Sequence, residues 1–196
     1  MRTAKRTSER HGEGDLLKGL LAGAVGGLVA SMVMNKFQAA LGKRIAGVEK
    51  SHGAQSLQRG LPRQGIGSDL QERGSDEPQD DAPMRLANAI SVGLSDRELT
   101  KDEKDAAGTA LHYAYGTSMA VLYGAAAEFA PVVTAGAGMP YGASIWVVAD
   151  EGVVPALGLS KSPEEYPLSI HAYALASHIV YGLTTEVVRR AVRKAL

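Results

Sequence analysis

The residues with the clearest potential for chemistry are two histidines in the last apolar stretch, His171 and His178. At about 100° per residue they fall on one face of a helix. The same stripe contains Leu175, Gly182, Thr185 and Arg189, with Glu186 at its edge. An imidazole inside an apolar helix can pass protons or bind a metal, because ionisable groups there face a bundle interior or water. A structural interpretation, in which each ring hydrogen-bonds a tyrosine or a backbone carbonyl, is favoured for His171 and stays open for His178.

Two adjacent carboxylates, Asp150 and Glu151, lie within another stretch that is otherwise apolar. Burial there disfavours their charged forms unless they are paired or hydrated. If either one meets His178 across a helix bundle, the pair forms a candidate proton relay that responds to low external pH. The alternative, which is slightly favoured, is that the helix ends at Asp150 and leaves both acids in interfacial water. Trp146, one turn before Asp150, is either an interfacial anchor or a lid over the acids.

A matching stripe upstream contains His112, Gly116, Met119 and Tyr123. His112 is near the predicted start of its helix, so contact with headgroup water is favoured over proton handling. His112, His171 and His178 together with an acid are suitable ligand types for a metal, but no short-range spacing marks a site. We therefore predict neither a metal nor a cofactor.

The chain carries no recognisable enzyme motif. The sequence lacks a GxSxG nucleophile elbow, an HExxH zinc helix and a GxxxxGK[ST] phosphate loop. It has no cysteine, which excludes disulfides, thiolate metal sites and a cysteine nucleophile. Lys plus Arg equal Asp plus Glu at 21 each, so there is no basic excess to attract nucleic acid. We predict a protein that is not an enzyme, has no catalytic residue and binds no nucleic acid.

Glycines recur every four residues in the first apolar stretch, at Gly19, Gly23 and Gly27. A helix face without side chains lets another helix approach closely, which is the small-xxx-small pattern of helices in lipid. This face is either a dimer seam or a contact with another helix of the same chain, and the second interpretation is favoured. Gly116 and Gly182 are predicted to allow close approach in the same way.

Charge is concentrated in a few segments, and four long stretches carry almost none. These stretches predict transmembrane helices at 16–41, 101–130, 138–157 and 168–190. The tails 1–15 and 191–196 are basic, and 42–100 reads as a polar loop with a short surface helix near 84–94. The expected fold is all-α, an integral membrane bundle of four transmembrane helices with a long polar loop between the first two. A signal peptide is the competing interpretation of the first stretch, but that stretch exceeds the roughly 7–15 apolar residues of such a segment.

Local signals predict where some of these helices begin and end. The spacing of Thr100 and Glu103 is that of a capping box, which predicts the start of the second long helix. Pro131 is predicted to end that helix, because its ring cannot continue the hydrogen-bond ladder. The following VVTAGAGMP is expected to be a flexible linker. An aromatic belt at the membrane surface is the interpretation for most of the tyrosines Tyr113, Tyr123, Tyr141, Tyr166, Tyr173 and Tyr181.

The charge of the two tails predicts the orientation. Four spans place both termini on one side, and both termini are basic, which favours cytoplasmic ends under the positive-inside rule. The polar loop carries more Lys and Arg than the tails. Loops beyond about 60 residues translocate largely regardless of charge, so this loop does not overturn the prediction.

Four segments together carry a resemblance to a known family. They are KGLLAGAVGGLVASMVMNKFQ, HYAYGTSMAVLYGAAAEFAP, GAGMPYGASIWVVADEGVVPALGLS and YPLSIHAYALASHIVYGLTTEVVRRAVR. The chain resembles the YagU-like family of bacterial inner-membrane proteins, a domain of unknown function, although the polar segment 42–83 carries no such resemblance. The resemblance implies a multi-span inner-membrane protein with a link to acid resistance. It brings no reaction, ligand or catalytic residue.

Two functional hypotheses follow. The first is a noncatalytic membrane protein of acid stress, in which protonation of buried histidine and carboxylate groups biases helix packing or passes protons. The alternative is a membrane scaffold or subunit that recruits a partner protein, or a second copy, through its Gly-rich faces and polar loop. The two differ in whether the histidine face points into the bundle beside Asp150 or away from it. The lipid bilayer is a partner in both.

Overall fold

The computed structural model describes residues 2–42 and 80–196, and all regular structure in this part of the chain is helical. The all-α prediction is therefore confirmed. The helices are α1 Arg2–Gly42, α3 Ala82–Ser95, α4 Lys101–Phe129, η1 Pro131–Gly138, α5 Met139–Ile145, η2 Trp146–Val153, α6 Val154–Ala156, η3 Pro163–Glu165 and α7 Leu168–Ala195. Most of the predicted polar loop, residues 43–79, lies outside the described residues.

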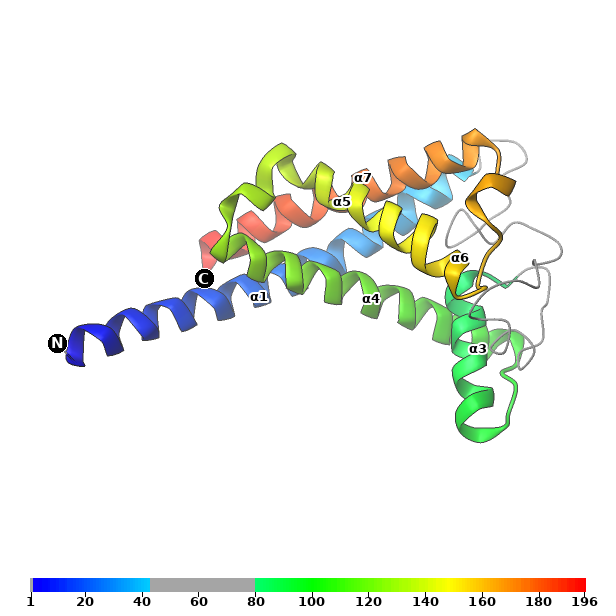
Figure 1. The fold of residues 1–196 in the computed structure, drawn as a ribbon, viewed down its shortest axis with the longest axis horizontal. Coiled ribbons are helices and arrows are strands. Elements are labelled where there is room, and N and C mark those ends of the chain that lie inside the picture. The colour runs from blue at the N-terminus through cyan, green and yellow to red at the C-terminus, as the bar shows by residue number, and fades with distance from the viewer. Residues whose placement is uncertain (1, 43–79) are drawn as a thin grey trace.

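Helix α1 packs against both α4 and α7. Two small faces of α1 allow this, because helices approach closely where no side chain separates their backbones. Gly23 faces the carbonyl of Ala120 in α4, and Gly26 faces the carbonyl of Thr185 in α7. The helical backbone begins at Arg2, so the predicted tail 1–15 continues α1 as a helix that extends beyond the bundle (Figure 1).

Both termini lie at the same end of the bundle, and α3 lies at the opposite end (Figure 1). At the terminal end, Arg193 of α7 donates a hydrogen bond of 2.8 Å to Asp15 of α1. It also donates two to Glu128 of α4, at 2.8 and 3.1 Å. One basic side chain therefore ties three helices together where the chain begins and ends.

Helix α4 begins with the predicted capping box, which is confirmed. The hydroxyl of Thr100 accepts a hydrogen bond from the amide of Glu103 (3.4 Å), and Oε2 of Glu103 accepts one from the amide of Thr100 (2.9 Å). Arg97 donates two further bonds to this carboxylate, at 3.0 and 3.1 Å. The bonds from Arg97, and after them those from Thr100, lower the pKa of Glu103 to about 2. The helix ends at Phe129, two residues ahead of Pro131.

Helix α3 corresponds to the predicted surface helix at 84–94, but one of its faces is buried against α4. Asp81 caps its start by accepting a hydrogen bond from the amide of Met84 (3.0 Å). Beside this cap, Nζ of Lys104 lies 2.7 Å from Oδ2 of Asp80 in a buried ion pair. The helix is therefore docked by polar contacts rather than lying loosely on the surface.

Residues 131–156 form a turn and then one continuous helical rod of α5, η2 and α6. The predicted flexible linker is instead a 3₁₀ helix with a kink, and its Gly138 (φ 83°) packs against the carbonyl of Gly182. Within the rod, η2 is a π-helix, a form that often marks functional sites. Because the helical backbone continues to Ala156, the alternative in which this helix ends at Asp150 is wrong.

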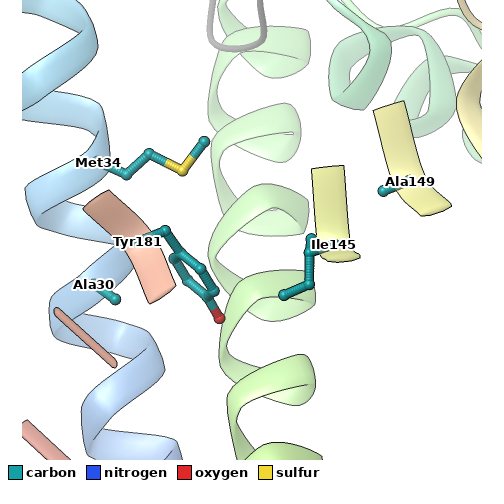
Figure 2. Close-up of a cluster of buried hydrophobic side chains, with 5 residues drawn as sticks. All are labelled: Ala30, Met34, Ile145, Ala149 and Tyr181. Carbon is teal, nitrogen blue, oxygen red and sulfur yellow. The ribbon is translucent and has the colours of Figure 1, made fainter. Parts of the chain in front are cut away.

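Small and aromatic side chains fill the core. Figure 2 shows one cluster, which joins α1, the rod and α7 through Ala30, Met34, Ile145, Ala149 and Tyr181. Further tyrosines are buried as well, namely Tyr123, Tyr166 and Tyr173. The aromatic belt predicted for most tyrosines is therefore wrong for these four, because their rings lie inside the protein.

Within the described residues, two stretches are long and apolar enough to cross a membrane, 15–41 and 131–156. Helices α4 and α7 have the length but a less apolar composition, so this property identifies two candidate spans where four were predicted. A core helix of a soluble protein, or a signal sequence, can share that length and composition. Helix α1 also exposes an apolar stripe made of Leu17, Leu21, Val25, Leu28 and Met32.

Candidate functional site

The two adjacent carboxylates of η2 reach two different places on α7. Asp150 lies beside His178, and Glu151 lies beside His171, two turns away along α7. Successive residues of a helix are rotated by about 100°, so neighbouring side chains cannot share one partner easily. The sequence left open which acid faces the bundle, and in the structure each acid faces its own histidine.

The contact between Glu151 and His171 holds a proton. Oε1 of Glu151 lies 2.8 Å from Nδ1 of His171, and Nε2 of the same ring lies 3.0 Å from the carbonyl oxygen of Pro163. A carbonyl oxygen only accepts hydrogen bonds, so Nε2 carries a proton. A hydrogen bond between Nδ1 and the carboxyl group then needs a second proton, on one partner or the other. The sequence favoured a structural role for His171, in which its ring hydrogen-bonds a tyrosine or a backbone carbonyl. The ring does contact a backbone carbonyl, that of Pro163, and it contacts the Glu151 carboxyl group as well.

The contact between Asp150 and His178 is longer. Oδ2 of Asp150 lies 3.7 Å from Nδ1 of His178, which is within ion-pair range but beyond hydrogen-bond distance. The Nδ1 atom lies 2.9 Å from the carbonyl oxygen of Ala174, so Nδ1 carries a proton and donates it there. The predicted meeting of these two side chains is therefore present as a through-space electrostatic contact.

A partly open cavity of about 510 Å³ lies beside Asp150, between α4 and the α5–η2–α6 rod. Its lining is mostly apolar and comes from α1, α3, α4, the rod and α7. The titratable side chains that line it are His112, Tyr115, Asp150, His178 and Tyr181. Among the described residues, Glu151 and His171 do not line it, so only one of the two carboxylate–imidazole pairs faces the cavity.

Two further predicted residues take positions near these pairs. His112 lines the cavity, and its ring lies edge-on to Tyr113 with the centroids 6.0 Å apart. Trp146 lies edge-on to His171, the partner of Glu151, with the ring centroids 6.4 Å apart. Within residues 2–42 and 80–196, no group of three His, Asp or Glu is arranged to hold a metal.

A family model described as "Protein of unknown function (DUF1440)" matches residues 63–187, more than half of the chain. The chain belongs to the DUF1440 family. No curated protein and no solved structure matches it. The DUF1440 region begins inside the polar segment 42–83, where no resemblance was found, and it includes both carboxylate–imidazole pairs but not α1. The family description assigns no reaction or ligand and makes no statement about acid resistance.

In this DUF1440 chain the predicted small-residue faces are occupied by other helices of the same chain. A Cβ atom on Gly27 would lie 2.5 Å from that of Ala120, and Gly19 and Gly23 likewise face α4. On α4, Gly116 faces the hydroxyl of Ser31. Gly182 packs against Gly138 and Gly142, which brings the rod close to α7. These contacts hold η2 near the two histidines.

Glu186 is a buried site residue of the DUF1440 region that the sequence placed only at the edge of a stripe. Its side chain is 1% exposed and accepts a hydrogen bond of 3.0 Å from the hydroxyl of Tyr123. Arg189 donates two bonds to it, at 2.7 and 3.0 Å, and Arg190 donates another. The Tyr123 ring stacks on Tyr141 with the centroids 4.1 Å apart. A carboxylate followed by arginines three and four residues later is a helical ion-pair signal that could have identified Glu186.

Proposed function

We propose that this DUF1440 chain is a multi-span protein of the bacterial inner membrane whose carboxylate and imidazole groups between η2 and α7 take up protons and support resistance to acid stress. The role is noncatalytic, because the groups bind protons and change how the helices pack. The observation that carries the proposal is that Asp150 and Glu151 each meet a histidine of α7. Ionisable groups within an apolar helix are functional candidates by default.

The exposed apolar surface supports placement in a membrane. Only 17% of the most apolar part of residues 131–156 is buried, whereas a core helix of a soluble protein is mostly buried. A large exposed apolar surface marks contact with a membrane or another protein. The exposed stripe of α1 adds a second such surface.

We extend the proposal to four spans, formed by α1, α4, the α5–η2–α6 rod and α7. Helices α4 and α7 have 29 and 28 residues. At 1.5 Å per residue each exceeds the roughly 30 Å of a hydrocarbon core. Both pack against α1, so a bilayer that surrounds α1 also surrounds them. The charged turn 101–105 and the basic end 191–196 lie outside the apolar layer in this arrangement.

The proposed orientation places both termini in the cytoplasm, because both ends are basic and lie together. Leu94 is 85% exposed at the α3 end, and Lys194 lies at the terminal end. In spheroplasts, an impermeant maleimide should label Leu94→Cys and leave Lys194→Cys unlabelled, with no native cysteine to interfere. The reverse pattern would overturn the orientation, and labelling of both sites would overturn the membrane-spanning arrangement.

Acid changes the charge of each pair. When both partners have taken up protons, a carboxylate–imidazole pair has a neutral carboxyl group and an imidazolium, and its net charge is +1. Once the carboxyl group is neutral, it no longer attracts the imidazolium, so η2 and α7 are held together less tightly. The cost of an unpaired charge in an apolar layer then favours a different packing of these helices.

The test is survival of an acid challenge by a bacterial strain that lacks its own copy of the gene. The wild-type chain should restore survival, and the double variant His171→Gln/His178→Gln should not. Glu103→Gln, which removes an exposed carboxylate remote from the pairs, should restore survival fully. Equal amounts of each protein in the membrane fraction exclude a loss of folding. Protection by the double variant at the wild-type level would overturn the proton-binding role, and no protection by the wild type would overturn the acid role.

The scaffold alternative loses one of its supports. The Gly-rich face of α1 that was proposed to recruit a partner is already packed against α4. A partner would have to displace α4 to use it. The acid-stress proposal is therefore the better supported of the two.

A further inference from the structure

The cavity beside Asp150 has the size and lining of a small-molecule site, which proton binding alone does not require. Its volume of about 510 Å³ falls within the range of roughly 300–1,000 Å³ that is usual for such sites. Apolar side chains such as Met34, Leu86, Leu111 and Val153 form most of the wall. A molecule that fills the cavity must therefore be largely apolar.

The carboxylate in the wall already has partners within the protein. Asp150 faces His178, which lines the same cavity, with Oδ2 and Nδ1 3.7 Å apart, and it makes further interactions as well. No Lys or Arg is among the described residues that line the cavity. A cationic ligand would have to compete with His178 for the carboxylate, and the carboxylate would repel an anionic ligand. A ligand without a net charge avoids both costs and leaves the pair in place.

A buried hydroxyl marks the place where an uncharged ligand can be anchored. Ser31 of α1 lines the cavity and is 1% exposed, and its Oγ atom has no hydrogen-bond partner among the described residues. This oxygen points towards Gly116 of α4, another lining residue, where an added Cβ atom would collide with it. The hydroxyl of Tyr181 in the same wall is engaged, because it donates to the carbonyl of Gly116 at 2.5 Å. A buried hydroxyl without a hydrogen bond is unfavourable, so a ligand that supplies one gains affinity.

We propose that this cavity binds an uncharged molecule with an apolar body and one hydroxyl or carbonyl group, and that this group hydrogen-bonds the hydroxyl of Ser31. A hydroxyl both donates and accepts hydrogen bonds, so Ser31 suits either kind of polar group. A hydrocarbon of the same size would fill the space but leave the Ser31 oxygen unpaired. The hydrogen bond therefore distinguishes the proposed ligand from a purely apolar one.

The inference goes beyond proton binding, and the two can fail separately. Ligand binding is measured at neutral pH on purified protein, and it needs no acid response. Survival of acid is measured in cells, and it needs no ligand.

The test is photolabelling of the full chain in lipid nanodiscs at neutral pH, with octan-1-ol that carries a diazirine group as the probe. Light attaches the bound probe to adjacent side chains, and mass spectrometry of the peptides locates it. Saturable labelling of the cavity wall is expected, and plain octan-1-ol should suppress it. Octane, octanesulfonate and octyltrimethylammonium, which have the same chain, should need about tenfold higher concentrations in the bilayer to do so.

Two serine variants test the anchor. Ser31→Ala removes the hydroxyl with little change of shape, and it should weaken binding of the probe by about three- to tenfold and abolish the preference for octan-1-ol over octane. Ser177→Ala is the matched control, because Ser177 is equally buried and does not line the cavity, and its hydroxyl already donates to the carbonyl of Tyr173. That variant should keep the wild-type affinity. Ser31→Ala should also keep the wild-type melting temperature in the absence of ligand, because its hydroxyl has no partner to lose.

A third variant tests the location. Leu111→Trp fills the cavity while keeping Ser31, and it should suppress labelling, with thermal melting to establish that it is folded. No saturable labelling of the wild type, equal competition by octane, or wild-type affinity in Ser31→Ala would each overturn the proposal. Equal competition by the two charged compounds would overturn the uncharged class of ligand. Labelling confined to peptides outside the cavity wall, or wild-type labelling of Leu111→Trp, would overturn the assignment to this cavity.

Discussion

Oε1 of Glu151 and Nδ1 of His171 lie 2.8 Å apart and join the π-helical segment η2 to α7. Their side chains are 18% and 20% exposed, so solvent screens the contact less than it screens a surface ion pair. Removing one partner leaves the other in partly apolar surroundings without its hydrogen bond. This pair should therefore contribute measurably to how η2 sits on α7.

A double-mutant cycle tests that contribution. His171→Ala and Glu151→Ala should be non-additive in the free energy of unfolding by about 1 kcal/mol, as for residues in contact. His178→Ala combined with Glu151→Ala should be additive to within about 0.5 kcal/mol, as for independent sites. The coupling free energy between His178 and Asp150 should fall between these two values, because the side chains are 3.7 Å apart without a hydrogen bond. Reversible unfolding in detergent provides the measurement. If the effects of His171→Ala and Glu151→Ala are additive, this pair does not contribute to the packing of η2 on α7.

Close packing of α1 on α4 makes a second prediction. Gly23→Leu drives a bulky side chain into the carbonyl of Ala120, and it should destabilise the bundle by about 1–3 kcal/mol or more. Gly93→Ala in α3 is the matched control, because a Cβ atom there meets nothing within 4 Å. That control should be neutral or should stabilise by about 0.5–1 kcal/mol through helix propensity. An unchanged melting temperature for Gly23→Leu would contradict the observed contact.

The buried Glu186 makes a third prediction. Glu186→Gln should destabilise the protein by about 3–5 kcal/mol, because Arg189 is then buried without its countercharge. Tyr123→Phe removes one hydrogen bond to the same carboxylate and should cost about 1 kcal/mol. Arg190→Gln should have a smaller effect than Glu186→Gln, since the Arg190 side chain is 58% exposed. Equal losses for Glu186→Gln and Arg190→Gln in denaturant unfolding would contradict this ranking.

The cap of α4 makes a prediction about pH. The pKa of Glu103 falls from an ordinary value of 4.5 to about 2 in the folded chain, chiefly through hydrogen bonds from Arg97. Its contribution to stability is therefore fully present above about pH 4.5 and is lost as the pH falls towards 2. An NMR titration of the Thr100 and Glu103 amides should show a midpoint well below 4.5, which Glu103→Gln should abolish. A midpoint near 4.5 would show that the carboxylate is not held by these bonds.

The sequence by itself determined what depends on residues near each other in the chain. The capping box of Thr100 and Glu103 is a local hydrogen-bond pattern, so three-residue spacing was enough to locate the start of α4. Helical periodicity likewise placed His171 and His178 on one face of α7, because the angle between residues is a property of the backbone. The all-α class followed from the long charge-poor stretches, because the absence of charge is also a property of consecutive residues.

Only the tertiary structure decided which side chains meet across the bundle. Asp150 and Glu151 are neighbours that point in different directions, so the rotation of η2 about its own axis decides which acid meets which histidine of α7. The π-helical backbone of η2 and the glycine contacts of α5 with α7 set that rotation. The sequence indicated that Gly182 allows close approach, but it did not give the angle at which η2 faces α7. The burial of Glu186 depends in the same way on Tyr123, a residue 63 positions away in the chain. Such contacts depend on how separate helices are packed, which the periodicity of any one helix does not contain.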